Sequence, residues 1–532
     1  MRNSREVRRF GDSALIARVG SVGDAHRLAA SLEDGAWEGV EDVIVGDRSV
    51  TVLADPRAAD LESLLPELAA LPLGVRHGRT PRTLEVPVAF DGPDLDEVAK
   101  LAGATPRQVI DLLVGTELEA AFLGFSPGFA YLRGLPTALA GLSRRGSPRS
   151  MVQSGSVGLG GGFAAIYPQQ SPGGWLIVGR TNLRLFDPQT PPFALIQAGD
   201  RVRFVEAHLQ DPMPLPRRAP LRSTAERVLE VHQPGILSLV EDKGRRAVAS
   251  LGVPRAGGAD PFSLRLSNRL VGNDDDAAAI EVTGIGPGLR AGAAMHVAVV
   301  GDVDLFVDDL PVPSNTVLPL APGQLLRAGT VKGTSRAYVA FGGGLDVPPV
   351  LGSRSTDTLC GLGCGPLRTG DVIGLGSPTR PRGWLNQPTA SQGPVTLRVL
   401  AGPEDFDHQQ VAGLTAATWI VGVDSDRVGV RLAGPPLRPP SAGIASQGMV
   451  TGALQVPPDG CPIALMCDHA TVGGYPVIAT VVSADLGLLG QLRPGDEARF
   501  EIVTQSEALA ALAAAERALE GRIAGHYPLC FE

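Results

Sequence analysis

The chain carries one order of glycine-rich turns twice, and this repeat constrains the fold more than any other feature of the sequence. Each copy has a turn with serine and glycine, then a Gly-Gly-aromatic turn, then a segment of the form G-D-x-x-R-F. These lie at 154–156, 173–175 and 199–204 in the first copy, and at 446–448, 473–475 and 495–500 in the second. Short apolar runs interrupted by glycine are typical of buried strands joined by tight turns. The repeat therefore predicts two similar β-barrels.

The composition supports a multidomain globular protein. At 532 residues, with 44% hydrophobic and 19% charged residues, the chain is long enough for several cores. Gly 67 and Pro 45 are spread through strand-like runs, which favours a turn-rich β protein. The net charge of -9 argues against nucleic-acid binding. Because we find no signal peptide and no long apolar run, we expect no membrane association and a cytoplasmic location.

We predict a mainly β protein with a small N-terminal α/β domain and tandem barrels. The expected parts are an α/β domain (1–80), a first barrel (81–206), a linker rich in proline and arginine (207–226), a β-rich region with two barrel halves (227–505), and a C-terminal helix and tail (506–532).

Local patterns predict several elements within these parts. Ala14–Val19 reads as a strand and His26–Leu32 as a helix, on which His26 is expected to be a solvated surface histidine. Thr105-Pro106-x-Gln108 is the signature of a capping box that starts a helix. A further helix is predicted between Phe262 and Val271.

The sequence contains no self-contained catalytic motif. None of the three lysines belongs to a P-loop, and H-E-x-x-H and G-x-S-x-G are absent. Cys360 and Cys364 have no second cysteine pair, so zinc is not predicted and no metal ligands are assigned. The five cysteines are expected to be reduced.

Polar residues in glycine-rich turns are the remaining candidates for a site. Carboxylates there could hold magnesium or move a proton, and arginines with exposed backbone N–H groups suit a phosphate or carboxylate. The candidates for catalysis are Asp260, Glu281, Asp426, Asp468 and His469. The candidates for binding substrate or nucleotide are Tyr131, Ser154, Gly155, Ser171, Gly173, Gly174, Arg180, Arg354, Ser355, Arg427, Gln455, Gly473, Gly474 and Tyr475. The alternative is that these residues cap strands and pair with one another.

Longer segments resemble known families. The segments at 124–132, 154–157, 166–168, 171–175, 179–181 and 185–188 resemble the allophanate hydrolase subunit 1 family, whose members are also called 5-oxoprolinase B subunits. The segments at 242–245, 252–254, 270–273, 351–356, 425–432, 455–460 and 473–476 resemble the allophanate hydrolase subunit 2 family, also called 5-oxoprolinase C subunits. Their order indicates a fusion of B and C, joined at the predicted linker.

The resemblance implies cyclophilin-like barrels that act with a separate 5-oxoprolinase A subunit. Its reaction would be the opening of 5-oxoproline to glutamate driven by ATP with magnesium. The chain alone is then expected to be inactive. Related modules form the carboxyltransferase part of urea carboxylase, or inhibit a sporulation histidine kinase, and both functions stay open as alternatives. No methionine is followed by lysine, so this chain has no biotin attachment site. Homo-oligomerisation also stays open.

Four positions depart from the family pattern. Leu113 stands where relatives commonly have histidine, Gln153 replaces a proline, Phe163 replaces a frequent glutamine, and Gln447 replaces a frequent glutamate. These changes place any substrate role at those positions in doubt. We further expect both halves to form one rigid unit in which their glycine-rich turns face a shared cleft.

Overall fold

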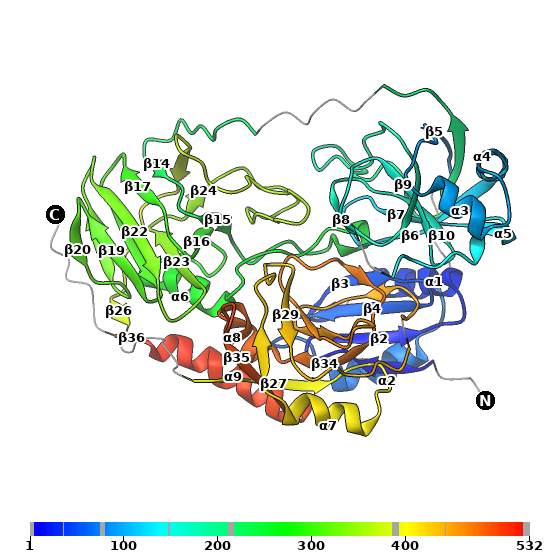
Figure 1. The fold of residues 1–532 in the computed structure, drawn as a ribbon. Helices are drawn as coiled ribbons and strands as arrows, with labels where there is room; N and C mark the ends of the chain where they lie inside the picture. Colours follow the sequence, from blue (N-terminus) through cyan, green and yellow to red (C-terminus); the bar gives the residue numbers. More distant parts are fainter. Residues whose placement is uncertain are drawn as a thin grey trace.

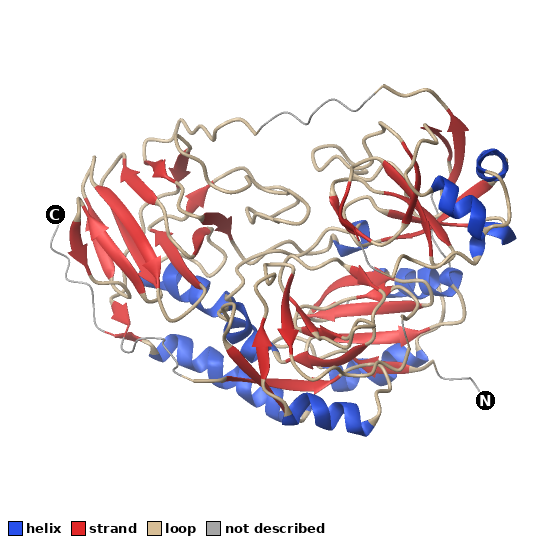
Figure 2. Cartoon of the chain, in the orientation of Figure 1, coloured by secondary structure: helices blue, strands red, loops and turns tan. Residues whose placement is uncertain are grey.

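The computed structural model describes residues 5–35, 37–74, 80–146, 149–210, 218–385, 393–441 and 443–524. Strands dominate all four parts of the molecule, and helices cover their edges (Figures 1 and 2). The predicted mainly β class is confirmed. Residues 211–217 of the predicted linker and 525–532 of the predicted tail lie outside the described residues.

The N-terminal part is a four-stranded antiparallel sheet of order β1-β2-β4-β3. Its elements are β1 (Val7–Arg9), β2 (Ala14–Arg18), α1 (Val22–Glu33), β3 (Val40–Val45), β4 (Ser49–Ala54) and α2 (Leu61–Ala70). Ser21 and Asp60 cap the two helices by accepting hydrogen bonds from their first backbone N–H groups. Both helices bury leucines against the sheet, and they include the predicted helix at 26–32.

The first barrel has the strand order β12-β9-β10-β7-β6-β13-β5. Its elements are β5 (Thr83–Val88), α3 (Leu95–Leu101), α4 (Pro106–Val114), β6 (Glu117–Leu123), β7 (Ala130–Arg133), α5 (Thr137–Ala140), β8 (Arg149–Val152), β9 (Ser156–Gly160), β10 (Phe163–Ile166), β11 (Ser171–Gly173), β12 (Leu176–Arg180) and β13 (Arg201–Glu206). A bridge between Ala89 and Arg180 joins the two outer strands. The capping box at Thr105 is confirmed at the start of α4.

Residues 228–375 form two sheets around one apolar core, drawn in green in Figure 1. The seven-stranded sheet has the order β20-β19-β22-β17-β14-β25-β24, and the five-stranded sheet has the order β15-β16-β23-β18-β21. The strands are β14 (Val228–Gln233), β15 (Leu237–Glu241), β16 (Ala279–Thr283), β17 (Gly288–Ala291), β18 (Met295–Val300), β19 (Val303–Val307), β20 (Leu310–Val312), β21 (Val317–Leu320), β22 (Leu325–Val331), β23 (Arg336–Phe341), β24 (Leu345–Asp346) and β25 (Val372–Leu375). The predicted helix at 262–271 is α6 (Pro261–Leu270), which packs on the five-stranded sheet.

The second barrel is closed and repeats the first barrel strand for strand. Its order, β34-β31-β32-β29-β28-β35-β27, matches β12-β9-β10-β7-β6-β13-β5. Its elements are β27 (Val395–Ala401), α7 (His408–Ala416), β28 (Trp419–Val421), β29 (Gly429–Ala433), β30 (Gln447–Gly448), β31 (Ala453–Gln455), β32 (Ile463–Leu465), β33 (Val472–Gly473), β34 (Val477–Val481), α8 (Leu486–Gly490) and β35 (Glu497–Ile502). In each barrel the first and last strands are parallel. The predicted duplication of barrels is therefore present in the structure, but the two serine-glycine turns are not equivalent. Gln447 and Gly448 form β30, which pairs with β33 as β8 pairs with β11, whereas Ser156 begins β9, the counterpart of β31.

The N-terminal sheet packs on the second barrel, so residues more than 400 positions apart in the sequence come into contact. Phe10, Ala14 and Ile16 share one buried cluster with Met449 and Leu465. Helix α9 (Gln505–Gly521) then runs from the second barrel to the two-sheet part (Figure 1). Within the described residues, no helix has the length and apolar character of a membrane span.

Candidate functional site

One segment of the second barrel, residues 466–475, connects three polar regions. Asp468 enters a buried ion cluster between the second barrel and the five-stranded sheet. His469 and Thr471 line a cavity next to it. Gly474 reaches the junction between the two barrels. Five residues of the predicted site, Asp468, His469, Gly473, Gly474 and Tyr475, lie on this segment.

Arg427 is the centre of the buried ion cluster, which consists of Glu241, Glu281, Arg336, Arg427 and Asp468. The side chain of Arg427 is 2% exposed. Its Nη2 lies 3.0 Å from Asp468 Oδ1 and its Nε lies 3.1 Å from Oδ2, while Nη1 pairs with Glu281. Glu281 also accepts hydrogen bonds from the Tyr338 hydroxyl at 2.7 Å and the Ala259 N–H at 2.8 Å.

Glu241 and Glu281 have pKa values that are shifted in opposite directions. Burial raises the pKa of Glu241 well above its usual range, against the attraction of Arg427, and neither oxygen of Glu241 has a hydrogen-bond partner. Burial also acts to raise the pKa of Glu281, but Arg427 and Arg336 outweigh it and the pKa is lowered. Arg427 Nη2 also lies 3.2 Å from Glu241 Oε1, so two arginines face three carboxylates, of which Glu241 is the one whose pKa is raised. Such a cluster fixes the barrel against the sheet and leaves no charge free for a ligand.

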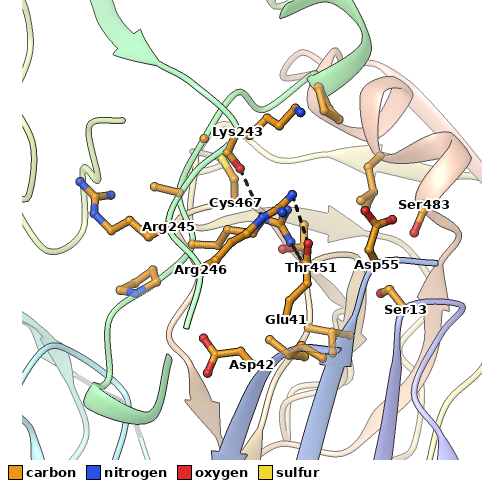
Figure 3. A pocket seen from close by; sticks show the side chains of 18 of the residues that line it. Ser13, Glu41, Asp42, Asp55, Lys243, Arg245, Arg246, Thr451, Cys467 and Ser483 are labelled. Carbon is orange, nitrogen blue, oxygen red and sulfur yellow. Dashed lines mark hydrogen bonds and ion pairs between the residues drawn. The ribbon is translucent and has the colours of Figure 1, made fainter. Parts of the chain in front are cut away.

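A cavity of about 260 Å³ lies where the N-terminal sheet, the segment 242–265 and the second barrel meet (Figure 3). Glu41 stands at its wall between two arginines, 3.2 Å from Arg246 and 2.5 Å from Arg255. Apolar side chains, including Ile44 and Met449, line the opposite part. The cavity thus combines apolar surface with charged groups, as small-molecule sites do. His469 lines it as a neutral imidazole, because burial lowers its pKa.

The two barrels meet at Arg144, an exposed residue that precedes β8. Its guanidinium lies 5.7 Å from the centre of the Trp175 ring, and Nη2 lies 3.4 Å from Ser446 Oγ of the second barrel. A Cβ atom on Gly474 would lie 2.9 Å from Arg144 Nη1, so a larger residue there would displace the guanidinium. The turns at 173–175 and 473–475 are therefore brought together, with Arg144 between them.

An aromatic cluster supports this junction from the first barrel. Tyr131 stacks on Phe122 at 4.4 Å between ring centres and meets the Trp175 ring edge-on at 5.7 Å. Burial raises the pKa of Tyr131, so its hydroxyl stays protonated. Val472 of the second barrel packs into the same cluster.

The other predicted catalytic residues lie apart from this junction. Asp260 caps α6, where Oδ1 accepts hydrogen bonds from the N–H groups of Phe262 and Ser263. Asp426 is exposed and caps the turn before β29 in the same way. Glu281 and Asp468 are brought together by Arg427, which lies between them and pairs with both. Within the described ranges, no three His, Cys, Asp or Glu side chains are grouped to hold a metal ion.

Two of the arginines that we predict to bind anions form ion pairs with a carboxylate of the same part of the molecule. Arg180 pairs with Asp91 at 2.9 Å, and Arg354 pairs with Asp346 at 3.1 Å. Ser355 is buried and donates to Asp242 at 2.6 Å.

The remaining predicted residues shape turns around the junction. Ser154 donates to the Pro168 carbonyl at 2.8 Å, and Gly155, with a φ of +82°, lies against the Thr181 carbonyl. Gln455 donates to Met449 Sδ at 3.3 Å. Ser171 is 4% exposed, and its hydroxyl has no hydrogen-bond partner.

His26 differs from its prediction as a solvated surface residue. It is half-buried, and its Nε2 lies 2.6 Å from the Ala121 carbonyl of the first barrel. The polar neighbours of His26 in sequence suggested solvent, but α1 turns this side chain toward β6. The atypical positions have structural roles as well: Leu113 is fully buried, and Phe163 meets Tyr131 at 5.6 Å between ring centres.

Several important residues escaped the sequence reasoning. Arg144, Arg246 and Arg255 are surface arginines in a chain with many, so composition gave no reason to select them. A clearer signal was missed in Gly92-Pro93-Asp94 and Gly402-Pro403-Glu404. This Gly-Pro-acid motif follows the first strand of each barrel and belongs to the same duplication.

Family models match most of the chain. "Carboxyltransferase domain, subdomain C and D" matches residues 5–196, and "Carboxyltransferase domain, subdomain A and B" matches residues 251–502. The 5-oxoprolinase C subunit of Escherichia coli is 34% identical over 297 residues, which cover 53% of this chain and 94% of that protein. The chain belongs to the carboxyltransferase-domain family of the 5-oxoprolinase B and C subunits.

Further relatives of this family match each half or the whole chain. The 5-oxoprolinase B subunit of Bacillus subtilis is 34% identical over 232 residues, covering 39% of this chain and 94% of that protein. The urea amidolyase of Saccharomyces cerevisiae is 31% identical over 301 residues, covering 51% of this chain but 16% of that protein. The crystal structure of TTHA0988 superposes with a TM-score of 0.83 at 34% identity, covering 93% of this chain and 100% of that one. The predicted B–C fusion is confirmed.

Proposed function

We propose that the chain is the fused B/C component of an ATP-dependent 5-oxoprolinase that opens 5-oxoproline to glutamate together with a separate A subunit. The observation that carries this proposal is the presence of a B-like and a C-like part in one chain, whose Gly-Gly-aromatic turns meet at Arg144. Relatives named as 5-oxoprolinase subunits match both parts over nearly their full length.

The chemistry explains why ATP is needed. The amide of a five-membered lactam is resonance-stabilised and resists attack by water. Transfer of the γ-phosphoryl group of ATP to the lactam oxygen releases ADP and makes the ring carbon electrophilic. Water then adds to that carbon, and the C–N bond breaks to give an amine and an acyl phosphate. A further water releases phosphate and leaves glutamate.

The exposed groups at the junction and cavity suit this substrate. A carboxylate needs a cation or backbone N–H groups, which Arg144 and the turn at 473–475 could offer at the junction. Arg246 and Arg255 could do so at the cavity. The neutral imidazole of His469 could accept a proton in the cavity wall. Asp468, Glu281 and Arg427 are too deeply buried to touch a ligand, so we assign them to positioning the 466–475 segment.

Magnesium would accompany the nucleotide. Asp260 and Asp426 accept hydrogen bonds from backbone N–H groups as caps, and Glu281 and Asp468 pair with Arg427. These carboxylates do not fit a magnesium site, so we route no step through the ion.

Reconstitution tests the proposal. The purified chain is mixed with a 5-oxoprolinase A subunit, 5-oxoproline and ATP, and glutamate is measured. We expect glutamate only in the complete mixture. Glutamate release by the chain alone would show that the A subunit is not required. A complete mixture that forms no glutamate would refute the proposed reaction.

A second candidate function is carboxyl transfer to urea, favoured by the match to urea amidolyase. It requires a biotin carrier from another protein. In a parallel reaction with carboxybiotin and urea, transfer of the carboxyl group from biotin to a urea nitrogen, dependent on this chain and independent of ATP, would favour this function over the first.

A further inference from the structure

In the first barrel, Asp94 holds the strand that follows the Gly-Gly-aromatic turn. Its Oδ2 accepts a hydrogen bond from the Ile177 N–H at 2.6 Å, and both its oxygens accept from Arg149 at 2.7 and 2.8 Å. Arg149 pairs with Gly173 across β8 and β11. The carboxylate therefore ties the turn at 173–175 to its neighbouring strands by a charged clamp made within the barrel.

In the second barrel, Glu404 occupies the equivalent place. Its Oε2 accepts from the Val477 N–H at 2.8 Å, and its Oε1 accepts from Gln447 Nε2 at 3.0 Å. Gln447 pairs with Gly473 across β30 and β33, as Arg149 pairs with Gly173. The register thus makes Gln447 the counterpart of Arg149, but a glutamine brings no charge to the buried carboxylate.

The missing cation comes from the N-terminal sheet. Arg18, the last residue of β2, donates from Nη2 to Glu404 Oε1 at 2.8 Å and from Nη1 to Gln447 Oε1 at 2.7 Å. The Glu404 side chain is 6% exposed and that of Arg18 is 30% exposed. A buried carboxylate without a cation beside it would destabilise the folded protein, so the clamp needs this arginine.

We propose that Arg18 is a positioning residue that completes the second barrel's clamp and so sets the Gly473–Tyr475 turn at the barrel junction. In the first barrel, both the carboxylate and the arginine of the clamp belong to the barrel itself. In the second barrel, the carboxylate belongs to the barrel and the arginine belongs to the N-terminal sheet. Docking of that sheet is thereby coupled to the geometry of the junction. The link to activity rests on the proposed function, but the link to the turn does not.

Gln447 fits this arrangement chemically. Its amide can accept from Arg18 and donate to Glu404 at the same time, which a glutamate could not do. An arginine at this position could reach the carboxylate directly, as Arg149 does in the first barrel. Gln447→Arg should therefore make Arg18 dispensable.

The chain supplies a matched control for the loss of an arginine. Arg8 of β1, in the same sheet, pairs through both terminal nitrogens with Asp405, the residue after Glu404, at 2.6 and 3.0 Å. The Asp405 side chain is 84% exposed, and Asp405 holds no part of the turn. Arg8→Ala therefore removes the same charge, together with the bonds to Asp405 and one bond to the Pro403 carbonyl at 2.9 Å, and it leaves the side-chain hydrogen bonds of Glu404 in place.

The test compares the full-length chain with Arg18→Ala, Arg8→Ala and Arg18→Ala/Gln447→Arg. Hydrogen exchange is followed in the peptide that contains residues 473–477, and glutamate release is followed with the A subunit present. We expect Arg18→Ala to speed exchange in this peptide by about 10-fold or more, Arg8→Ala to leave it within about 2-fold, and the double variant to restore it. Turnover should follow the same order.

Three results would overturn the proposal. The first is unchanged exchange of this peptide in Arg18→Ala, and the second is equal effects of Arg8→Ala and Arg18→Ala. The third is a double variant that regains thermal stability but not slow exchange. If Arg18→Ala does not fold, the double variant and Arg18→Lys decide the question, because the proposal requires both to fold with a protected turn. The exchange data test the role of Arg18 even if the wild-type chain opens no 5-oxoproline. Failure of the proposed function can therefore be distinguished from failure of this proposal.

Discussion

Asp94 and Glu404 occupy equivalent positions in the two barrels: each accepts a hydrogen bond from the backbone N–H of the strand after a Gly-Gly-aromatic turn, at 2.6 Å from Ile177 and 2.8 Å from Val477. Each follows a Gly-Pro pair, and the two glycines, Gly92 and Gly402, donate to equivalent carbonyls of the same strands. The duplication therefore extends from strand order to single hydrogen bonds. It makes the acid of the Gly-Pro-acid motif a structural residue.

Asp94→Asn should lower the free energy of unfolding by about 2–3 kcal/mol, because the charged bonds to Arg149 are lost in a side chain that is 4% exposed. Asp91→Asn is the matched control, since Asp91 is 51% exposed in its pair with Arg180 and should cost less than about 1 kcal/mol. Urea unfolding monitored by fluorescence measures both. Equal losses in the two variants would contradict a structural role for the motif.

Replacement by glutamine should change the free energy of unfolding very differently at Glu281 and at Glu241. Glu281→Gln should destabilise the fold by about 3–5 kcal/mol, because it breaks a buried ion pair with Arg427. Glu241→Gln should be nearly neutral or stabilising, because burial raises the pKa of Glu241 and so favours its uncharged form. Chemical denaturation at neutral pH compares them. A large loss in Glu241→Gln would show that Glu241 is ionised in the native protein.

Asp468→Asn should affect folding more than chemistry. Both oxygens of Asp468 are occupied by Arg427 and Thr358, and an amide would turn a donor toward one of them. We expect a loss of about 3–5 kcal/mol with normal turnover per folded molecule. Asp426→Asn, in an exposed turn, should change stability by less than about 0.5 kcal/mol. A stable Asp468→Asn protein whose turnover falls by about 100-fold would instead support a catalytic role.

Asp357 should make stability depend on pH. Burial and the neighbouring Asp468 raise its pKa from 3.8 to about 7. The folded protein then keeps a proton that the unfolded chain loses, so between pH values of about 4 and 7 the free energy of unfolding falls as pH rises, by up to about 1.4 kcal/mol per pH unit. Above pH 7 this contribution is constant.

Asp357→Asn removes the proton equilibrium and isolates this effect. The stability of the variant relative to wild type should be higher at pH 8 than at pH 5. Urea unfolding at both pH values measures the difference. A stability difference that is the same at pH 5 and pH 8 would show that Asp357 has an ordinary pKa in the folded protein.

Much of the fold could be predicted from the sequence, because the repeated turns and the helix caps depend on residues that are close together in the chain. The capping box at Thr105 and the helix after Asp260 depend on neighbours within a few residues, so their patterns were sufficient. The contact of His26 with Ala121 depends on how the N-terminal sheet docks on the first barrel. No local pattern encodes that docking.

The site was predicted less completely than the fold. Gly173, Gly473 and Gly474 were predicted because a turn against which other side chains pack closely leaves glycine in the sequence. Arg427 and Asp468 were found by their position beside glycine, but their burial and mutual pairing appear only when the second barrel meets the five-stranded sheet. Arg18 and Arg144 act across domain boundaries, so their partners lie hundreds of residues away in the chain.

The most direct test of the central claim is the ratio of glutamate formed to phosphate released when the chain, the A subunit, 5-oxoproline and ATP are combined. Our account predicts equal amounts of the two products, and neither product above background when this chain or 5-oxoproline is omitted. Phosphate release that does not depend on 5-oxoproline, or a mixture that forms no glutamate, would contradict the assignment of this chain as a 5-oxoprolinase B/C component.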